Sequence, residues 1–473
     1  MRNFLARLDL SYLYAFLGEL TLGLTFLLYI VLARVLGPEK YGIFASAVAL
    51  AGIMSLFMQF GLPPLLNREV AANPEEGSKS TIKFLLLELL NTLPVLIILL
   101  PIAHLMGFKG EELIVCYLAI FAEFCRGIKM TQRSVLKGMG WFRTETISVA
   151  IERCAVVLCT LAVLFLTKSL VWVVTTLVVV RLLENLGLLY YLSRKVTVWS
   201  PFNFSNLIES LKIAYPFALF GVLWVIYYQI DLVMLKAIAP TGEAGFYGAA
   251  YKIMEILSAL PRVIFYVAFT RFARTYAADP DRLGWQIYKA TRILVSLVIP
   301  VLLVAGFLQT TLVQILYGDD YFNSIQCLGI LLPNVIVASF GEFTRYILVA
   351  MEKEKSLPPI LLGAVISNIA INAILIPMLG AVGAAIATLL SEFVLVMIAL
   401  TVIIRIGYSQ VGSTIRLIVV ISLLATAMPS LILYGLKSSI SICIVVTCLL
   451  GLVMLVRRDR FIENVEKPSN SED

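Results

Sequence analysis

Charged residues are scarce in this 473-residue sequence, because Asp, Glu, Lys and Arg together make up only 14% of it. Soluble domains are about a quarter charged, so this composition excludes a water-exposed surface of ordinary extent. Polar linkers long enough to hold a soluble domain are missing too. What is present is 60% hydrophobic residues, gathered into recurring apolar stretches of about 20 residues, each long enough to cross a bilayer as a helix.

Several motifs of enzymes and metal proteins are also missing. The sequence has one His, no HExxH, no CxxC pair among its seven Cys, and no GxxxxGK[ST] phosphate loop. These absences argue against a His-rich metal site and against an ATPase. The acidic pair Asp319-Asp320 is interpreted as a solvated turn rather than a catalytic pair. We therefore expect neither enzyme activity nor a cofactor or metal.

The apolar stretches predict an all-α polytopic membrane protein, because a backbone that spans a bilayer must satisfy its own hydrogen bonds. We predict about 14 transmembrane helices. Their approximate limits are 11–33, 41–63, 80–104, 112–132, 144–167, 169–192, 208–236, 245–269, 287–316, 322–350, 356–378, 381–404, 412–435 and 439–456.

The formal net charge of +7 is interpreted as a topology signal, not as a nucleic-acid surface. Lys and Arg concentrate in one set of loops and at both chain ends, as expected of the cytoplasmic side. The opposite loops hold only Arg34, Lys40, Lys109, Lys168, Lys236 and Lys437. This bias predicts a multi-pass protein of the cytoplasmic membrane with both termini in the cytoplasm.

The chain also repeats itself at a nearly constant offset. Tyr41-Gly42 matches Tyr247-Gly248 and Pro94 matches Pro300, both 206 positions later. Glu184 matches Glu392 at an offset of 208. One repeat covers six spans, so the two halves have the same orientation, and substrate sites commonly lie between such parallel repeats.

The repeat predicts a domain organisation. Residues 1–195 form one six-helix bundle, and residues 196–405 form a second bundle that repeats it. Residues 406–456 add two transmembrane helices, and residues 457–473 form a cytoplasmic polar tail.

Charged residues inside the spans are the candidate functional groups, because burying a charge in a membrane is costly. Four pairs of opposite charge are spaced three residues apart, on one helical face. They are Glu123 with Arg126, Arg181 with Glu184, Lys252 with Glu255, and Glu342 with Arg345. Each pair is either an internal ion pair that fixes helix packing or part of the wall of a polar cavity.

Asp231 differs from these pairs, because no basic residue lies within one turn of it. A lone carboxylate in a span can carry a proton or coordinate a cation, or it can simply hydrogen-bond near a helix end. Glu19 and Glu88 have weaker claims of the same kind. We take Asp231, Glu255 and Glu19 as candidates for ion coupling.

The segment from Leu32 to Gly42, LARVLGPEKYG, resembles the ARxLGPxxYG signature of polysaccharide-biosynthesis transporters. The resemblance continues in weaker motifs over nearly the whole chain. These are Phe60-Gly61-Leu62, Asn67-Arg68-Glu69-Val70-Ala71, Tyr215-Pro216-Phe217-Ala218, Gly245-Phe246-Tyr247-Gly248-Ala249-Ala250-Tyr251 and Tyr317-Gly318-Asp319-Asp320-Tyr321. The family is that of the Wzx-type oligosaccharide-lipid flippases, within the superfamily of multidrug, oligosaccharidyl-lipid and polysaccharide exporters.

This resemblance implies a V-shaped pair of bundles around a central, often cationic cavity. It also implies that an oligosaccharide on a polyprenyl diphosphate is flipped from the inner to the outer leaflet by alternating access, for surface polysaccharide synthesis. Arginine suits a diphosphate because its planar fork makes bidentate contacts. The candidate cavity contacts are Arg126, Arg153, Arg181, Lys252, Arg262 and Arg345, with Arg34 at the outer mouth.

Other functions remain open at this point. An exporter of small organic compounds, coupled to cations, is the main alternative with the same fold. An integral-membrane glycosyltransferase or polymerase is disfavoured by the short outer loops, and a non-transporting scaffold is a further hypothesis. Membrane lipid and the lipid-linked oligosaccharide are the expected ligands. A polysaccharide polymerase or a glycosyltransferase is a candidate partner, and nucleic acid is not.

Overall fold

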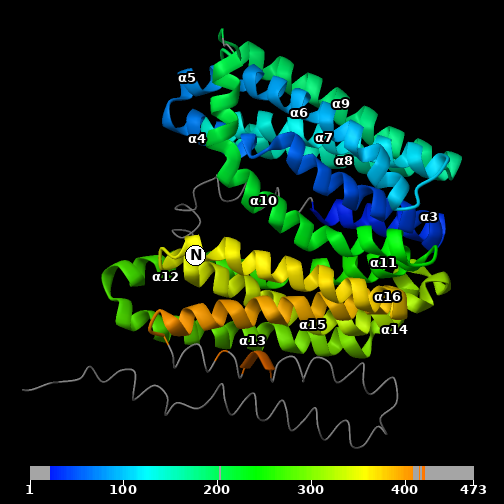
Figure 1. Ribbon diagram of the computed structural model, residues 1–473. Helices are drawn as coiled ribbons and strands as arrows, with labels where there is room; N and C mark the ends of the chain where they lie inside the picture. Colours follow the sequence, from blue (N-terminus) through cyan, green and yellow to red (C-terminus); the bar gives the residue numbers. More distant parts are fainter. Residues whose placement is uncertain (1–21, 202–203, 409–414, 416–417, 421–473) are drawn as a thin grey trace, which may run out of the picture. The chain divides into compact units, whose positions relative to one another are not determined.

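The computed structural model describes residues 22–201, 204–408, 415 and 418–420. All regular structure among these residues is helical, as the sequence predicted (Figure 1). The predicted span 412–435 lies outside the described residues except at 415 and 418–420, and the predicted span 439–456, the polar tail 457–473 and the candidate Glu19 lie wholly outside them.

The described chain divides after Gly245 into two compact units, called unit 1 and unit 2 here. Unit 1 holds α3 (Leu22–Gln59), α4 (Leu62–Ala72), α5 (Pro74–Lys79), α6 (Thr81–Leu105), α7 (Glu111–Gly138), α8 (Phe142–Thr167), α9 (Leu170–Lys195) and α10 (Phe204–Ile238). The sequence-based domain limit at 195/196 stays a prediction.

Unit 2 begins within α11 (Glu243–Leu257), whose first three residues belong to unit 1. It continues with α12 (Ala259–Ala278), η1 (Pro280–Arg282), α13 (Leu283–Phe307), α14 (Gln309–Tyr317), η2 (Asp319–Tyr321), α15 (Phe322–Ala350), η3 (Glu354–Ser356) and α16 (Leu357–Arg405). Most of α15 is buried, and it packs against α12, α13, α14 and α16.

Helix α6 shows why these helices require a lipid environment. One of its faces is buried in unit 1 and includes Phe84, Glu88 and Thr92. The other face exposes large apolar side chains at helical spacing, namely Leu86, Leu89, Leu90, Leu93 and Ile97. An exposed apolar stripe of this length is stable when lipid covers it, because water would make it an aggregation site.

Eight helices among the described residues are long and apolar enough to cross a membrane. Two of them each hold two predicted spans. In α3, Gly37 has non-helical φ/ψ of 74° and 169°. The rings of Tyr29 and Phe44 lie 5.6 Å apart, whereas 15 residues of straight helix would separate them by about 22 Å. The chain therefore folds back at Gly37.

The same reasoning applies to α16, which breaks at Gly380 (φ 55°, ψ −130°). Asn368 Nδ2 lies 3.1 Å from Ser391 Oγ, although 23 residues of straight helix would separate them by about 34 Å. This helical hairpin matches the predicted spans 356–378 and 381–404. The total of fourteen crossings stays a prediction, because part of the chain is not described.

Glycines allow the closest helix contacts at these turns. A Cβ atom on Gly383 would collide with the backbone of Leu375 on the other arm of α16. A Cβ atom on Gly245, at the start of α11, would collide with the backbone of Pro38 in α3. The GPEKYG segment thus owes part of its residue pattern to backbone packing within unit 1.

A hydrophobic cluster joins one end of several unit 1 helices, where α4 packs against α7 and α10. Its buried members are Leu62, Leu65, Leu66, Val70, Phe84, Leu87, Val135, Leu136, Leu188, Leu192, Leu207 and Ala214. The guanidinium of Arg68 also lies 5.7 Å from the ring centroid of Phe217. This packing fixes α7 at the centre of unit 1, in contact with α3, α4, α6, α8 and α9.

Candidate functional site: a buried charge network in unit 1

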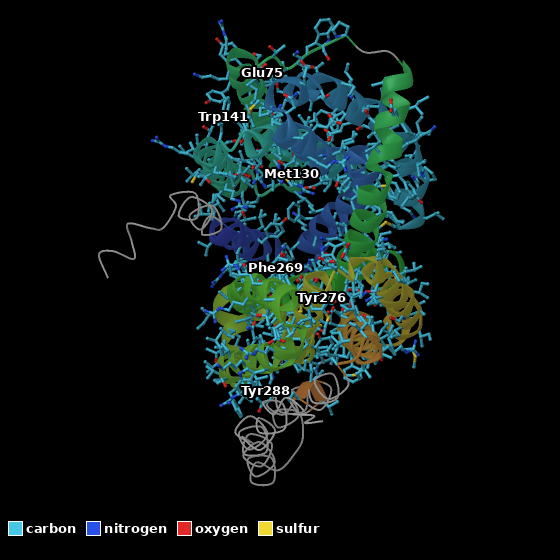
Figure 2. All side chains as sticks on the ribbon, turned by 90° about the vertical axis from the view of Figure 1, so that its left-hand side faces the viewer. Glu75, Met130, Trp141, Phe269, Tyr276 and Tyr288 are labelled. Carbon is cyan, nitrogen blue, oxygen red and sulfur yellow. The ribbon has the colours of Figure 1, made fainter. Side chains whose placement is uncertain are left out.

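Helix α7 carries three charged residues at three-residue spacing: Glu123, Arg126 and Lys129. This spacing makes each of them a neighbour of the next on the helix surface. Glu123 and Arg126 pair with each other, and further partners come from α8 and α9, which pack against α7 and against each other. Met130, the residue after Lys129, is labelled in Figure 2 and marks this part of the helix among the side chains of unit 1.

Glu123 is held by two arginines. Arg126 Nε lies 2.5 Å from Glu123 Oε2, and Arg181 Nη1 of α9 lies 3.1 Å from Glu123 Oε1. Arg181 Nη1 also donates to the carbonyl of Ala122 at 2.9 Å. One carboxylate thus bridges two guanidinium groups from neighbouring helices, in the way that a phosphate bridges two arginines.

Lys129 is surrounded by oxygens. Its ammonium group lies 2.7 Å from Glu152 Oε2 of α8, and it also donates to the carboxylate of Glu184 of α9. The carbonyl of Ser148 lies 3.3 Å away. Arg181 Nε is 3.9 Å from Glu152 Oε1, which joins this group to the Glu123 pair.

The network contains equal numbers of acidic and basic side chains. Its members are Glu123, Arg126, Lys129, Glu152, Arg181 and Glu184. Removing one partner from a buried ion pair leaves an uncompensated charge and costs about 3–5 kcal/mol. The balanced count is therefore what allows so many charges inside an apolar bundle.

Arg126 and Lys129 differ sharply in exposure. The Lys129 side chain is 3% exposed, whereas the Arg126 side chain is 41% exposed. Within the described residues only Nε of Arg126 is engaged, so its two Nη groups are available for an anion. Arg126 is thus the accessible end of the network.

In unit 2, two of the predicted ion pairs form between residues that are three apart in the chain. Lys252 Nζ lies 2.7 Å from Glu255 Oε2, and Arg345 Nη2 lies 2.5 Å from Glu342 Oε2. The Arg345 guanidinium also sits 4.6 Å from the ring centroid of Tyr346. Both pairs neutralise themselves within one helical turn.

The other predicted site residues are placed as follows. Asp231 lies on α10 and is 2% exposed, Arg34 is exposed on α3, and Arg153 is partly buried on α8 beside Glu152. Arg262 belongs to α12, but its side chain lies outside the described part of the structure. The contacts of the described residues bring two members of the predicted cationic set, Arg126 and Arg181, into one network.

The predicted ion pair between Arg181 and Glu184 was wrong. Their partners lie on other helices, because Arg181 pairs with Glu123 and Glu184 pairs with Lys129. Sequence reasoning also missed Lys129 and Glu152. A signal existed: Lys129 extends the Glu123–Arg126 spacing by three more residues on α7.

A second buried carboxyl, Glu88 of α6, lies outside this network. It is 1% exposed, and Thr131 Oγ1 of α7 donates to Glu88 Oε1. Its other oxygen, Oε2, is buried with no hydrogen-bond partner in the described structure. The Asp319-Asp320 pair, by contrast, is exposed in η2. The described residues hold no group of three His, Cys, Asp or Glu arranged for a metal ion.

The helical fold and the buried charges are those of a polytopic membrane protein. Solved structures of two such proteins share the fold. An inward-facing multidrug resistance MATE transporter of the MOP superfamily has a TM-score of 0.67 and 16% identity, over 83% of this chain and 95% of that one. The lipid II flippase MurJ, in an inward closed conformation, has a TM-score of 0.66 and 14% identity, over 95% of this chain and 100% of that one.

The chain belongs to the polysaccharide biosynthesis protein family, whose model matches residues 11–276. It is also 22% identical to an uncharacterized membrane protein of Methanocaldococcus jannaschii, over 81% of this chain and 94% of that protein. Family and fold together make it a multi-pass membrane protein of the polysaccharide biosynthesis family, with a fold similar to that of the MOP-superfamily MATE transporter and of MurJ. They confirm the family expected from the LARVLGPEKYG segment.

Proposed function

We propose that this transporter flips a polyprenyl-diphosphate-linked oligosaccharide from the inner to the outer leaflet of the cytoplasmic membrane. A diphosphate with attached sugars cannot cross hydrocarbon unaided, because burying its charges and hydroxyls without partners is too costly. Membership of the polysaccharide biosynthesis family supports this substrate class. Alternating access of the two predicted six-helix bundles, 1–195 and 196–405, is the expected mechanism.

The observation that carries the proposal is the pair of arginines on Glu123. Two guanidinium groups already converge on one carboxylate, and the Arg126 side chain is 41% exposed. A diphosphate carries more negative charge than a carboxylate and accepts bidentate bonds from arginine. We infer that the headgroup binds Arg126 first and then competes with Glu123 for Arg181.

The remaining predicted residues take supporting roles in this proposal. Lys252, Arg262, Arg345, Arg34 and Arg153 are further candidate contacts for the headgroup. Asp231 and Glu255 are candidates for coupling to an ion. The expected partners are the enzymes that make the lipid-linked oligosaccharide and those that polymerise it on the outer side.

A cellular experiment tests the substrate class. Cells that lack the chain should accumulate lipid-linked oligosaccharide on the inner leaflet and lose surface polysaccharide, and the intact gene should restore both. The same cells should extrude an organic cation such as ethidium at the normal rate. Normal surface polysaccharide together with lost ethidium efflux would instead identify an exporter of small organic compounds, the alternative with the same fold.

A further inference from the structure

Lys129 occupies an oxygen-lined site deep in unit 1. Three oxygens surround its ammonium group: one from the Glu152 carboxylate, one from the Glu184 carboxylate and the carbonyl of Ser148. The side chain is 3% exposed, so bulk water does not solvate this charge. The positive charge comes from α7, whereas all three oxygens come from α8 and α9.

The ligand set around the ammonium is one that metal cations also use. Carboxylate and main-chain carbonyl oxygens are the ligands that hard cations prefer. Glu184 Oε2 is also buried, with no hydrogen-bond partner among the described residues, so the site has one more oxygen than the ammonium uses. Ser148 Oγ lies 3.4 Å from the other oxygen, Glu184 Oε1.

The charges around this site set the charge of its occupant. Glu152 and Glu184 face the ammonium, and Arg181 Nε lies 3.9 Å from Glu152 on the far side. Glu123 and Arg126 neutralise each other at the next position along α7. A monovalent cation at Lys129 therefore balances the network, whereas no cation or a divalent one leaves a net charge in a medium of low dielectric.

We propose that Lys129 is a tethered cation, which permanently fills a site that would otherwise bind a dissociable monovalent metal ion such as Na⁺. Unit 1 thereby keeps its carboxylate pair neutralised without taking up a metal ion. The inference concerns binding and stability, so it does not depend on which substrate the transporter moves.

The test removes the ammonium group by mutation and adds Na⁺ to the solution. Lys129→Ala leaves the oxygens in place and opens room for an ion. The purified variant should unfold at a temperature that rises by a few degrees, on the order of 3 °C, when choline chloride is replaced by NaCl at constant ionic strength. The wild-type protein should respond less than the variant, because any Na⁺ bound at the ion-coupling candidates Asp231 and Glu255 would affect both proteins alike.

Three further variants separate this effect from simple loss of charge. Lys129→Met removes the charge but fills the space, so it should respond to Na⁺ no more than wild type. Lys79→Ala removes a lysine that pairs with Glu76 outside the network, and it should behave as wild type. Adding Glu184→Gln to Lys129→Ala removes one charged ligand and should reduce the Na⁺ response at least severalfold.

The proposal is overturned by any of three results. One is a Lys129→Ala protein that unfolds at the same temperature in both salts. The second is a larger stabilisation by CaCl₂ than by NaCl. The third is a Lys129→Ala protein that folds in neither salt while Lys129→Met folds, because Na⁺ would then have failed to replace the ammonium group.

Discussion

Arg126 and Arg181 bind the same carboxylate but are expected to serve different purposes. Arg126 is exposed at the edge of the network, whereas Arg181 is largely buried and contacts Glu123, Glu152 and the Ala122 carbonyl. The group that substrate meets first should be accessible, whereas a group that also holds helices together should be enclosed. This difference makes the two arginines separable by mutation.

We therefore predict that Arg126→Ala lowers the rate of oligosaccharide flipping by about tenfold or more, because it loses a charge-assisted hydrogen bond worth about 1.5–3 kcal/mol. Its unfolding temperature should stay within about 1–2 °C of wild type, because Glu123 keeps Arg181 as a partner and a pair with an exposed arginine contributes about 0–1 kcal/mol. Flipping in proteoliposomes and thermal unfolding in detergent measure the two effects. Unchanged flipping would remove Arg126 from the headgroup site.

Arg181→Ala should instead destabilise the protein clearly, by about 3–5 kcal/mol, because it leaves buried carboxylates without their partner. Thermal unfolding measures this loss. Arg181→Lys is the matched control, since it restores the charge but not the fork that reaches both Glu123 and Glu152. An Arg181→Ala protein as stable as Arg126→Ala would contradict the division of roles.

Thr131 supplies the single side-chain hydrogen bond that Glu88 receives in the described structure. Thr131→Val keeps the shape of the side chain but removes the donor, so a buried carboxyl loses its partner. We predict a loss of about 1–3 kcal/mol in the free energy of unfolding. Thr131→Ser, which keeps the hydroxyl, should recover most of it. Equal stability of the Val and Ser variants would show that the bond contributes nothing.

At the residue scale, sequence spacing predicted local pairs and could not predict those between helices. Predicted ion pairs formed within single helices, because residues three apart share a helical face. Among them are Glu123 with Arg126 and Glu342 with Arg345. Arg181 found its partner 58 positions away in the chain, on α7. Which faces of α7, α8 and α9 meet depends on packing, and a single sequence does not specify that.

At the element scale, the hairpin within α16 depends on a side chain being absent at Gly383. Gly383→Ala should destabilise the protein by about 1–3 kcal/mol, because its Cβ would press on the Leu375 backbone, which cannot rotate away. Gly363→Ala is a matched control on the same helix, because its Cβ would meet only the tip of Ile398, 3.4 Å away. Thermal unfolding compares the two, and equal stability would contradict the close packing.

Spans could be predicted from the sequence better than the joins between them. The apolar stretches at 356–378 and 381–404 correspond to the two arms of α16, which turn at Gly380. Hydropathy alone does not mark such a turn, because apolar residues continue through it. The buried face of α6 was also not predicted, since both of its faces are apolar apart from residues such as Glu88 and Thr92.

At the scale of the whole molecule, family and fold were predicted from the LARVLGPEKYG segment and the number of apolar stretches. The matched family and the solved transporters confirm the family and the all-helical polytopic fold, whereas the fourteen spans and the V-shaped pair of bundles stay predictions. The substrate cannot be predicted in the same way, because a multidrug transporter and a lipid flippase share this fold with similar TM-scores. In the proposed function the substrate is selected by a few charged side chains, such as Arg126, and mutation tests them directly.

The most direct test is transport by the purified chain in proteoliposomes. A polyprenyl-diphosphate-linked oligosaccharide should cross the bilayer faster in the presence of the wild-type protein than in its absence, and Arg126→Ala should reduce this difference about tenfold while Lys79→Ala leaves it intact. The same proteoliposomes should not move ethidium. Ethidium transport by the wild-type chain, with the lipid-linked oligosaccharide remaining in its original leaflet, would contradict the flippase account.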